Sequence, residues 1–161
     1  WSLDIDAKTV AVGDIYFGDH NQGRVTVLQL GATAYACSGF EPPMADYPVT
    51  VKKSRALPLK AQVFDADGYA MTDAQFDAPP VLQVLFDSGA GGDPVDVTDD
   101  ALPAGLGTEG NQFVFTAGGN WQFNLLTKNY SAPGTYIVTM ETGDDTEYEI
   151  DPACVTEFVI Q

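Results

Sequence analysis

The chain has 161 residues, of which 45% are hydrophobic, so it is long enough to form one compact domain with a substantial core. Seven basic residues against 23 acidic ones give a formal net charge of -16, which repels nucleic acid and anionic membrane surfaces. No run approaches the roughly 18 apolar residues of a membrane span. We therefore expect neither a nucleic-acid partner nor insertion into a membrane.

The first strand signal stands at the start of the chain, where Trp1, Leu3 and Ile5 alternate with polar residues. Two further apolar runs, 10–17 and 24–30, flank a loop that is rich in Gly, Asp and Asn. Such a pattern is typical of two paired strands. It predicts an N-terminal β-ribbon.

A connection is expected over residues 35–43, because its two final prolines cannot donate hydrogen bonds to a sheet ladder. We place the domain boundary in this segment. Residues 1–38 are then an N-terminal β-ribbon or strand extension, and residues 39–161 form the main sandwich.

Four stretches carry the clearest strand signals of the main domain. Residues 57–63, 121–125 and 136–140 alternate apolar and polar side chains, which places the apolar set on one face. Residues 81–86 are almost continuously apolar, which favours a central strand. No helical periodicity of sufficient length competes with these signals. The predicted fold class is all-β, an immunoglobulin-like β-sandwich with an additional N-terminal β-ribbon.

Two connecting segments support this prediction. The turn over 129–134 ends in Pro-Gly and leads into Tyr136, as in sandwiches where a tyrosine hydroxyl ties the corner to the backbone. We predict this bond for Tyr136. Residues 87–111 are long and polar, and we expect them to form the largest loop.

Residues 39–161 also resemble a known family. The stretches that carry the resemblance are 39–43 (GFEPP), 51–60 (VKKSRALPLK), 64–68 (FDADG), 110–113 (GNQF) and 121–124 (WQFN) with Tyr136. Together they are similar to the PxKF domain, a module repeated in secreted and cell-surface bacterial proteins. The naming motif reads Pro58-Leu59-Lys60-Ala61 here, so the final aromatic residue is absent and the relationship is divergent. The resemblance implies a β-sandwich module placed beside other modules, and it assigns no catalytic or ligand residue.

The sequence offers little for catalysis. His20 is the only histidine, which leaves no second histidine for a zinc site and makes a solvated loop residue the simpler interpretation. Carboxylate pairs of the glycosidase kind arise by chance among 23 acidic residues. We expect no enzymatic activity.

Calcium is the one cofactor that the sequence suggests. Asp65, Asp67 and Asp73 gather hard oxygen ligands around a turn, and residues 87–100 contain a second group of aspartates. The alternative is that Asp65 to Gly68 is an ordinary hairpin turn, because Asp and Gly tolerate left-handed backbone conformations. Both interpretations stay open.

Four of the seven basic residues lie close together, at Lys52, Lys53, Arg55 and Lys60. They either guard an edge strand against unwanted pairing or dock onto the acidic face of a neighbouring copy or module. A carbohydrate partner is the alternative from another functional class, and it would require exposed aromatic residues. Trp121, Phe113 and Phe115 fall on inward positions, so core packing suits them better.

The only two cysteines, Cys37 and Cys154, are predicted to form a disulfide, because the composition is that of exported β proteins. The expected location is therefore extracellular, secreted or at the cell surface. With the resemblance described above, we predict a non-enzymatic extracellular structural or interaction module of a bacterial surface or secreted protein. Its N-terminal stripe of Trp1, Leu3 and Ile5 either pairs with its own sandwich or is donated to the next copy, which would generate filaments.

Overall fold

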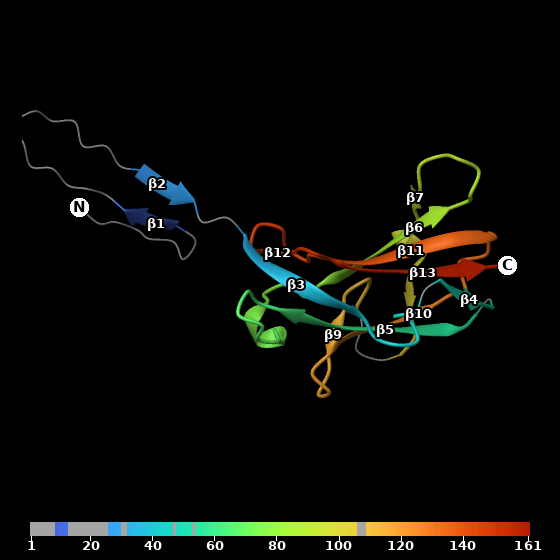
Figure 1. The fold of residues 1–161 in the computed structure, drawn as a ribbon, viewed down its shortest axis with the longest axis horizontal. Helices are drawn as coiled ribbons and strands as arrows, with labels where there is room; N and C mark the ends of the chain where they lie inside the picture. The colour runs from blue at the N-terminus through green and yellow to red at the C-terminus, as the bar shows by residue number, and fades with distance from the viewer. Residues whose placement is uncertain (1–8, 13–25, 30–31, 47, 53, 106–108) are drawn as a thin grey trace, which may run out of the picture. The chain divides into compact units, whose positions relative to one another are not determined.

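The computed structural model describes residues 9–12, 26–29, 32–46, 48–52, 54–105 and 109–161 (Figure 1). The chain falls into two compact units, Trp1–Ala32 and Thr33–Gln161. In the first unit, β1 (Thr9–Val12) pairs antiparallel with β2 (Thr26–Gln29). Trp1, Leu3, Ile5 and His20 lie outside the described residues. No helix in the described part of the chain is long and apolar enough to cross a membrane.

Six strands form the first sheet of the second unit. They are β3 (Thr33–Phe40), β5 (Ala56–Phe64), β8 (Leu102–Pro103), β9 (Val114–Phe115), β10 (Trp121–Leu126) and β12 (Tyr148–Ile150). Their order is β12-β3-β5-β10-β8, and β9 also pairs with β10. Only β12 and β3 run parallel, so the sheet is mixed.

Five strands form the second sheet. They are β4 (Val49–Val51), β6 (Val81–Asp87), β7 (Val95–Asp96), β11 (Gly134–Glu141) and β13 (Cys154–Ile160). Their order is β4-β13-β11-β6-β7, with β4 and β13 parallel. Two short 3-10 helices, η1 (Asp73–Gln75) and η2 (Thr98–Asp100), complete the described elements, which include no α-helix. The all-β prediction is therefore confirmed, as two mixed sheets packed together.

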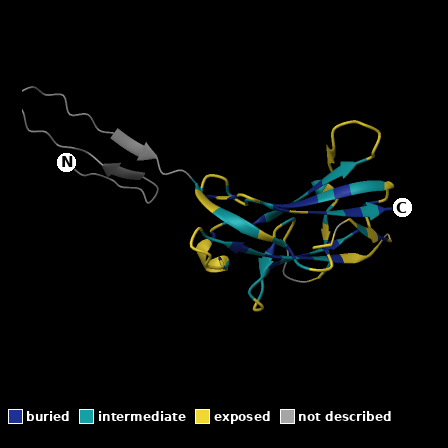
Figure 2. Cartoon of the chain, viewed as in Figure 1, coloured by how far each residue is buried: buried dark blue, intermediate teal, exposed yellow. Residues whose placement is uncertain are grey.

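The core lies between the two sheets and follows the predicted alternation (Figure 2). The buried residues are Leu57, Leu59, Ala61 and Val63 on β5, Trp121, Phe123 and Leu125 on β10, and Tyr136, Val138 and Met140 on β11. Burying a large apolar side chain contributes roughly 1.5 to 3 kcal/mol relative to leaving it exposed. The period-two pattern in the sequence thus reports the faces that hold the two sheets together.

The connection predicted over residues 35–43 is wrong in its first half, because Thr33–Phe40 forms β3. A bulge between Cys37 and Phe40 shifts the register of β3 against β5, and Gly39 adopts a φ of +89° within it. The bulge breaks the strict alternation on which a strand signal depends. The paired prolines follow directly after the strand ends.

Within the segment predicted as the largest loop, residues 87–105 are more ordered than a plain loop, since they contain β7, η2 and β8. This segment also supplies partners for the outer side of β6. The Val97 amide donates to the Val84 carbonyl (2.9 Å), and the Leu82 amide donates to the Asn111 carbonyl (2.7 Å). Because these bonds cover β6, the strand is internal to its sheet, as its apolar sequence predicted.

Candidate functional site

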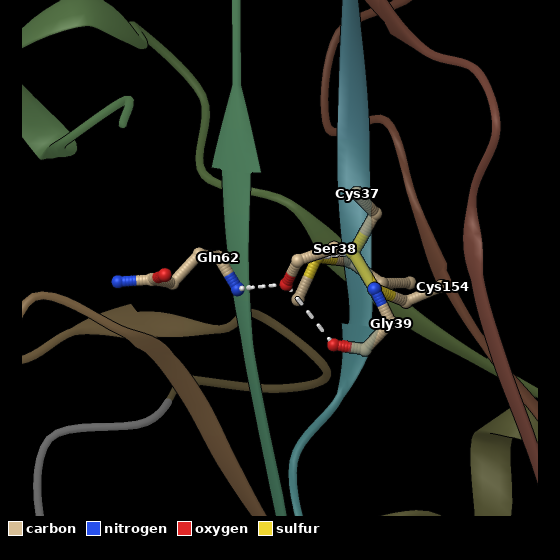
Figure 3. Close-up of a disulfide and its surroundings, with 6 residues drawn as sticks. Cys37, Ser38, Gly39, Gln62 and Cys154 are labelled. Atoms are coloured by element: carbon tan, nitrogen blue, oxygen red, sulfur yellow. Dashed lines mark hydrogen bonds between the residues drawn. A yellow bond between two sulfur atoms is a disulfide. The ribbon is translucent and has the colours of Figure 1, made fainter. Parts of the chain in front are cut away.

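The predicted disulfide between Cys37 and Cys154 is present (Figure 3). Cys37 belongs to β3 and Cys154 to β13, so the bond joins the two sheets across the core. The two Cα atoms are 5.3 Å apart, and 117 positions separate the residues in the sequence. Disulfides form and persist in oxidising compartments. The bond therefore indicates that the protein acts in such an environment.

The bulge in β3 begins at Cys37, one of the two disulfide cysteines. Side chains supply hydrogen bonds where the bulge interrupts the β-ladder. The Gly39 amide donates to Sγ of Cys154 (3.1 Å). The Gln62 amide donates to Oγ of Ser38 (3.2 Å), which in turn donates to the Gly39 carbonyl (3.1 Å), as Figure 3 shows. Glycine suits position 39 because its positive φ is strained for other residues.

Tyr136 ties its corner as predicted, since its hydroxyl donates to the Ala132 carbonyl (3.0 Å). Its ring stacks on Phe158 at a centroid distance of 4.9 Å. Burial raises the pKa of Tyr136 above its ordinary value. The neutral hydroxyl is thus the form that the corner holds.

Tyr148 makes a second, longer-range tie that the sequence did not reveal. Its hydroxyl donates to the Ala78 carbonyl (2.8 Å) and accepts from the Gly143 amide (2.9 Å). Burial raises the pKa of Tyr148 to about 12. The Tyr148 hydroxyl therefore links the segment before β6 to the turn after β11.

The structure places Asp65 in a hydrogen-bonded turn. Its Oδ1 accepts from the amides of Asp67 (3.0 Å) and Tyr69 (2.8 Å), and Gly68 has a φ of +84°. Asp73 lies in η1, whose N-terminus is capped by Thr72. Within the described residues, no three acidic, histidine or cysteine side chains are grouped to hold a metal ion. The geometry favours the turn interpretation, and calcium binding stays a prediction without an assembled set of ligands.

The acidic residues of 87–100 also serve local turns. Oδ1 of Asp87 accepts from the Gly89 amide (2.7 Å), and Oδ1 of Asp96 accepts from the Thr98 amide (2.9 Å). Hydrogen bonds from the side chain and backbone of Thr98 lower the pKa of Asp96. Both aspartates thus accept hydrogen bonds from neighbouring backbone amides.

Two acidic hollows adjoin each other at Glu141. The first, of about 480 Å³, is lined by Asp96 and Asp99 together with the amides of Gln83 and Asn111. The second, of about 460 Å³, is lined by Asp145, Tyr148 and Glu149. We call these two sites the acidic hollows. They present negative charge from β7, β11 and β12 and the turns beside them.

The basic residues lie elsewhere, on and before β5. Lys52 and Arg55 are exposed, Lys60 is half-buried, and Lys53 lies outside the described residues. The buried Thr127 holds this segment by its backbone. Its hydroxyl accepts from the Arg55 amide (3.0 Å) and lies within donating distance of the Arg55 carbonyl (3.1 Å) and the Lys52 carbonyl (3.4 Å).

The backbone at Lys52 and Arg55 is therefore held by Thr127, and both side chains are exposed. Lys128 is also exposed, and it follows Thr127 directly. We call Lys52, Arg55, Lys60 and Lys128 the basic edge, although β5, which carries Lys60, is internal to its sheet, so Lys60 does not guard an edge strand.

Sequence reasoning missed Thr127 and Lys128 as parts of this surface. The signal for Thr127 is available, because position 127 continues the inward series that begins at Trp121. A polar residue at an inward position requires a hydrogen-bond partner. Nothing in the sequence alone identifies the 52–55 segment as that partner.

The aromatic residues considered for carbohydrate binding are positioned as predicted. Phe113 and Trp121 are each 1% exposed, and Phe115 packs edge-on against Trp121. Tyr69, at 70%, is the one strongly exposed aromatic side chain in the described part of the chain. Core packing therefore accounts for the first three residues.

No model of a known protein family matches this chain, and no curated protein or solved structure matches it. The resemblance to the PxKF family and the immunoglobulin-like topology accordingly stay predictions from the sequence.

Proposed function

We propose that this chain is an extracellular, non-enzymatic structural or interaction module of a surface or secreted protein. Its partner is a neighbouring module or a second copy of itself, and the basic edge is the surface that docks. The observation that carries the proposal is the basic edge, where Thr127 holds the backbone at Lys52 and Arg55 while both of these side chains are exposed. The immunoglobulin-like assignment belongs to the same proposal, supported by the Tyr136 corner and the disulfide between the sheets.

Charge supports a docking role for this edge. With a net charge of -16, two copies repel each other at most orientations. The basic edge of one copy facing the acidic hollows of another is an orientation in which the repulsion is locally reversed. The two surfaces differ, so such a contact runs head to tail and can propagate into a filament.

Magnitudes bound the strength of this contact. An exposed ion pair contributes only about 0.2 to 1 kcal/mol, and salt screens it over a length of about 10 Å at 0.1 M ionic strength. Docking through charge alone is therefore weak and sensitive to salt. Donation of the N-terminal strand would add main-chain hydrogen bonds to the contact.

Sedimentation velocity at low and high salt tests the proposal. The wild type is expected to associate at low salt, and the triple reversal Lys52→Glu, Arg55→Glu and Lys60→Glu is expected to stay monomeric. The matched control, Lys52→Arg with Arg55→Lys and Lys60→Arg, keeps every charge and should associate like the wild type. Equal sedimentation of the wild type and the triple reversal at every salt concentration would contradict a docking role.

Deletion of residues 1–6 distinguishes the two alternatives for the N-terminal stripe, which are donation to a second copy and pairing with its own sandwich. If the strand is donated, the truncated chain remains an equally stable monomer but no longer assembles. If the strand pairs with its own sandwich, truncation lowers the stability of the monomer. Circular dichroism melting with sedimentation distinguishes the two.

A carbohydrate-binding module is the second candidate function, and one observation favours it. The outward face of β5 and β10 presents Gln62, Gln122 and Asn124, with Nε2 of Gln122 donating to Oδ1 of Asn124 (3.0 Å). Amide groups of this kind can hydrogen-bond sugar hydroxyls. Binding on a glycan array that is lost in Gln122→Ala or Tyr69→Ala would favour this function over docking.

A further inference from the structure

We propose that Asn129 is an acceptor site for an N-linked glycan. The residues Asn129-Tyr130-Ser131 fit the Asn-x-Ser/Thr acceptor pattern, and the middle residue is not proline. The chain has five asparagines, and the other four lack Ser or Thr two positions later. The sequence thus offers a single acceptor.

The local structure presents this acceptor to solvent. Asn129 and Ser131 are both exposed in the turn between β10 and β11. Tyr130, between them, is 2% exposed, and its ring packs on Tyr136 at 5.0 Å and on Phe158 at 5.8 Å. The buried middle residue anchors the turn, and both residues of the acceptor pattern remain on its outer side.

The amide of Asn129 can carry a glycan without losing its bond in the fold. Its Nδ2 has two hydrogens and donates one to the Asp100 carbonyl (3.1 Å). In the transfer, the sugar C1 leaves the phosphate oxygen of a lipid-linked sugar diphosphate and bonds to Nδ2. One amide proton is released, and the diphosphate departs with the bonding electrons. The remaining N–H can still donate to Asp100.

The disulfide gives an independent reason to expect this modification. Oligosaccharide transfer to asparagine and disulfide formation both take place on exported chains. Cys37 and Cys154 are bonded in the structure. A chain that reaches a compartment where this disulfide forms has been exported, and export is what N-glycosylation requires.

Intact-mass measurement of the full chain tests the proposal. The chain is secreted from a host whose export pathway carries an oligosaccharyltransferase, and it is weighed before and after treatment with a peptide N-glycosidase. The wild type and Ser131→Thr are expected to carry a glycan mass that the enzyme removes. Asn129→Gln and Ser131→Ala are expected to lack that mass.

Ser131→Ala is the control for misfolding, because it removes the acceptor pattern but keeps Asn129 and its hydrogen bond to Asp100. A wild type that has the mass of the bare polypeptide would overturn the proposal. A glycan that persists in Asn129→Gln would overturn it too, by placing the modification elsewhere. The measurement is independent of the docking proposal, since it does not depend on association.

Discussion

Two aromatic clusters pack in the same core but differ in how their polar atoms are bonded. The first, here the β12 cluster, contains Tyr35, Phe76, Trp121 and Tyr148, with Phe76 and Tyr148 at a ring distance of 4.4 Å. The second, the β11 cluster, contains Phe86, Tyr130, Tyr136 and Phe158, with Tyr130 and Tyr136 at 5.0 Å. Ring packing is therefore similar in the two.

The hydrogen bonds are not similar. In the β12 cluster, Nε1 of Trp121 donates to the Met71 carbonyl (3.2 Å), and the Tyr148 hydroxyl reaches Ala78, 70 positions away in the sequence. In the β11 cluster, Tyr136 bonds only four positions away, and the buried Tyr130 hydroxyl has no hydrogen-bond partner among the residues that the structure describes. Aromatic burial alone therefore does not determine how much stability a substitution removes. Bonds to distant backbone make the β12 cluster the more sensitive one.

The largest expected effect comes from breaking the covalent link between the two sheets. The disulfide connects β3, which carries Tyr35 of the β12 cluster, with β13, which carries Phe158 of the β11 cluster. Cys37→Ala with Cys154→Ala should lower the free energy of unfolding by about 4 to 5 kcal/mol on the chain-entropy account. Urea unfolding measures this. As a control, the reduced wild type should lose the same amount of unfolding free energy. An unchanged unfolding midpoint would argue against a stabilising role for the disulfide.

Tyr148→Phe should have the next largest effect. It removes one hydroxyl and leaves both the Ala78 carbonyl and the Gly143 amide without their partner. The Ala78 carbonyl belongs to a half-buried residue, and leaving it without a partner costs about 1 to 3 kcal/mol, whereas water can replace the hydroxyl at the amide of the exposed Gly143. A loss of about 2 kcal/mol is therefore expected. Thermal unfolding measures it beside Tyr69→Phe, whose exposed hydroxyl should not matter. Equal stabilities of these two variants would refute the long-range tie.

Alkaline pH should weaken the β12 cluster through the same hydroxyl. Burial holds the pKa of Tyr148 at about 12 in the folded protein, against 10.0 for an ordinary tyrosine. A raised folded pKa gives stability that is present below pH 10 and is lost as the pH rises toward 12. Unfolding free energies measured across this range should fall for the wild type and fall less for Tyr148→Phe. Parallel curves would count against the assignment.

Tyr136→Phe should cost less than Tyr148→Phe. Only one local bond, to the Ala132 carbonyl, is lost, and Ala132 is an exposed residue where water can replace the hydroxyl. A loss of about 1 kcal/mol is expected. Chemical denaturation of the two variants side by side checks the order, and a larger loss for Tyr136→Phe would reverse the comparison.

Tyr130→Phe is expected to cost nothing, or to stabilise slightly. A buried hydroxyl without a partner is unfavourable, and phenylalanine removes it while keeping the ring against Tyr136 and Phe158. The melting temperature should equal or exceed that of the wild type. A loss as large as that of Tyr136→Phe would show that the hydroxyl has a partner in solution.

Some of these features could be predicted from the sequence because they depend on local periodicity. The alternation in 57–63, 121–125 and 136–140 reports which side chains enter the core. The disulfide followed from there being only two cysteines, and the Tyr136 bond from the turn before it. Each of these inferences needs only short-range information or a simple count.

Other features could not be predicted, because they depend on which distant segments meet. The bulge at Gly39 hides a strand, since it breaks the alternation. The contact of Tyr148 with Ala78, and that of Thr127 with Lys52 and Arg55, join segments that no spacing relates. Whether aspartates gather into a metal-binding group is likewise a matter of chain path, and no such group forms among the described residues.

The most direct test of the account is a count of thiols in the protein as its own cells export it. The structure joins its two sheets through Cys37 and Cys154, and the proposed extracellular role depends on that bond. Alkylation under denaturing conditions, followed by mass spectrometry, should find no free thiol before reduction and two after it. Two alkylated cysteines before reduction would contradict both the disulfide and the proposed extracellular location.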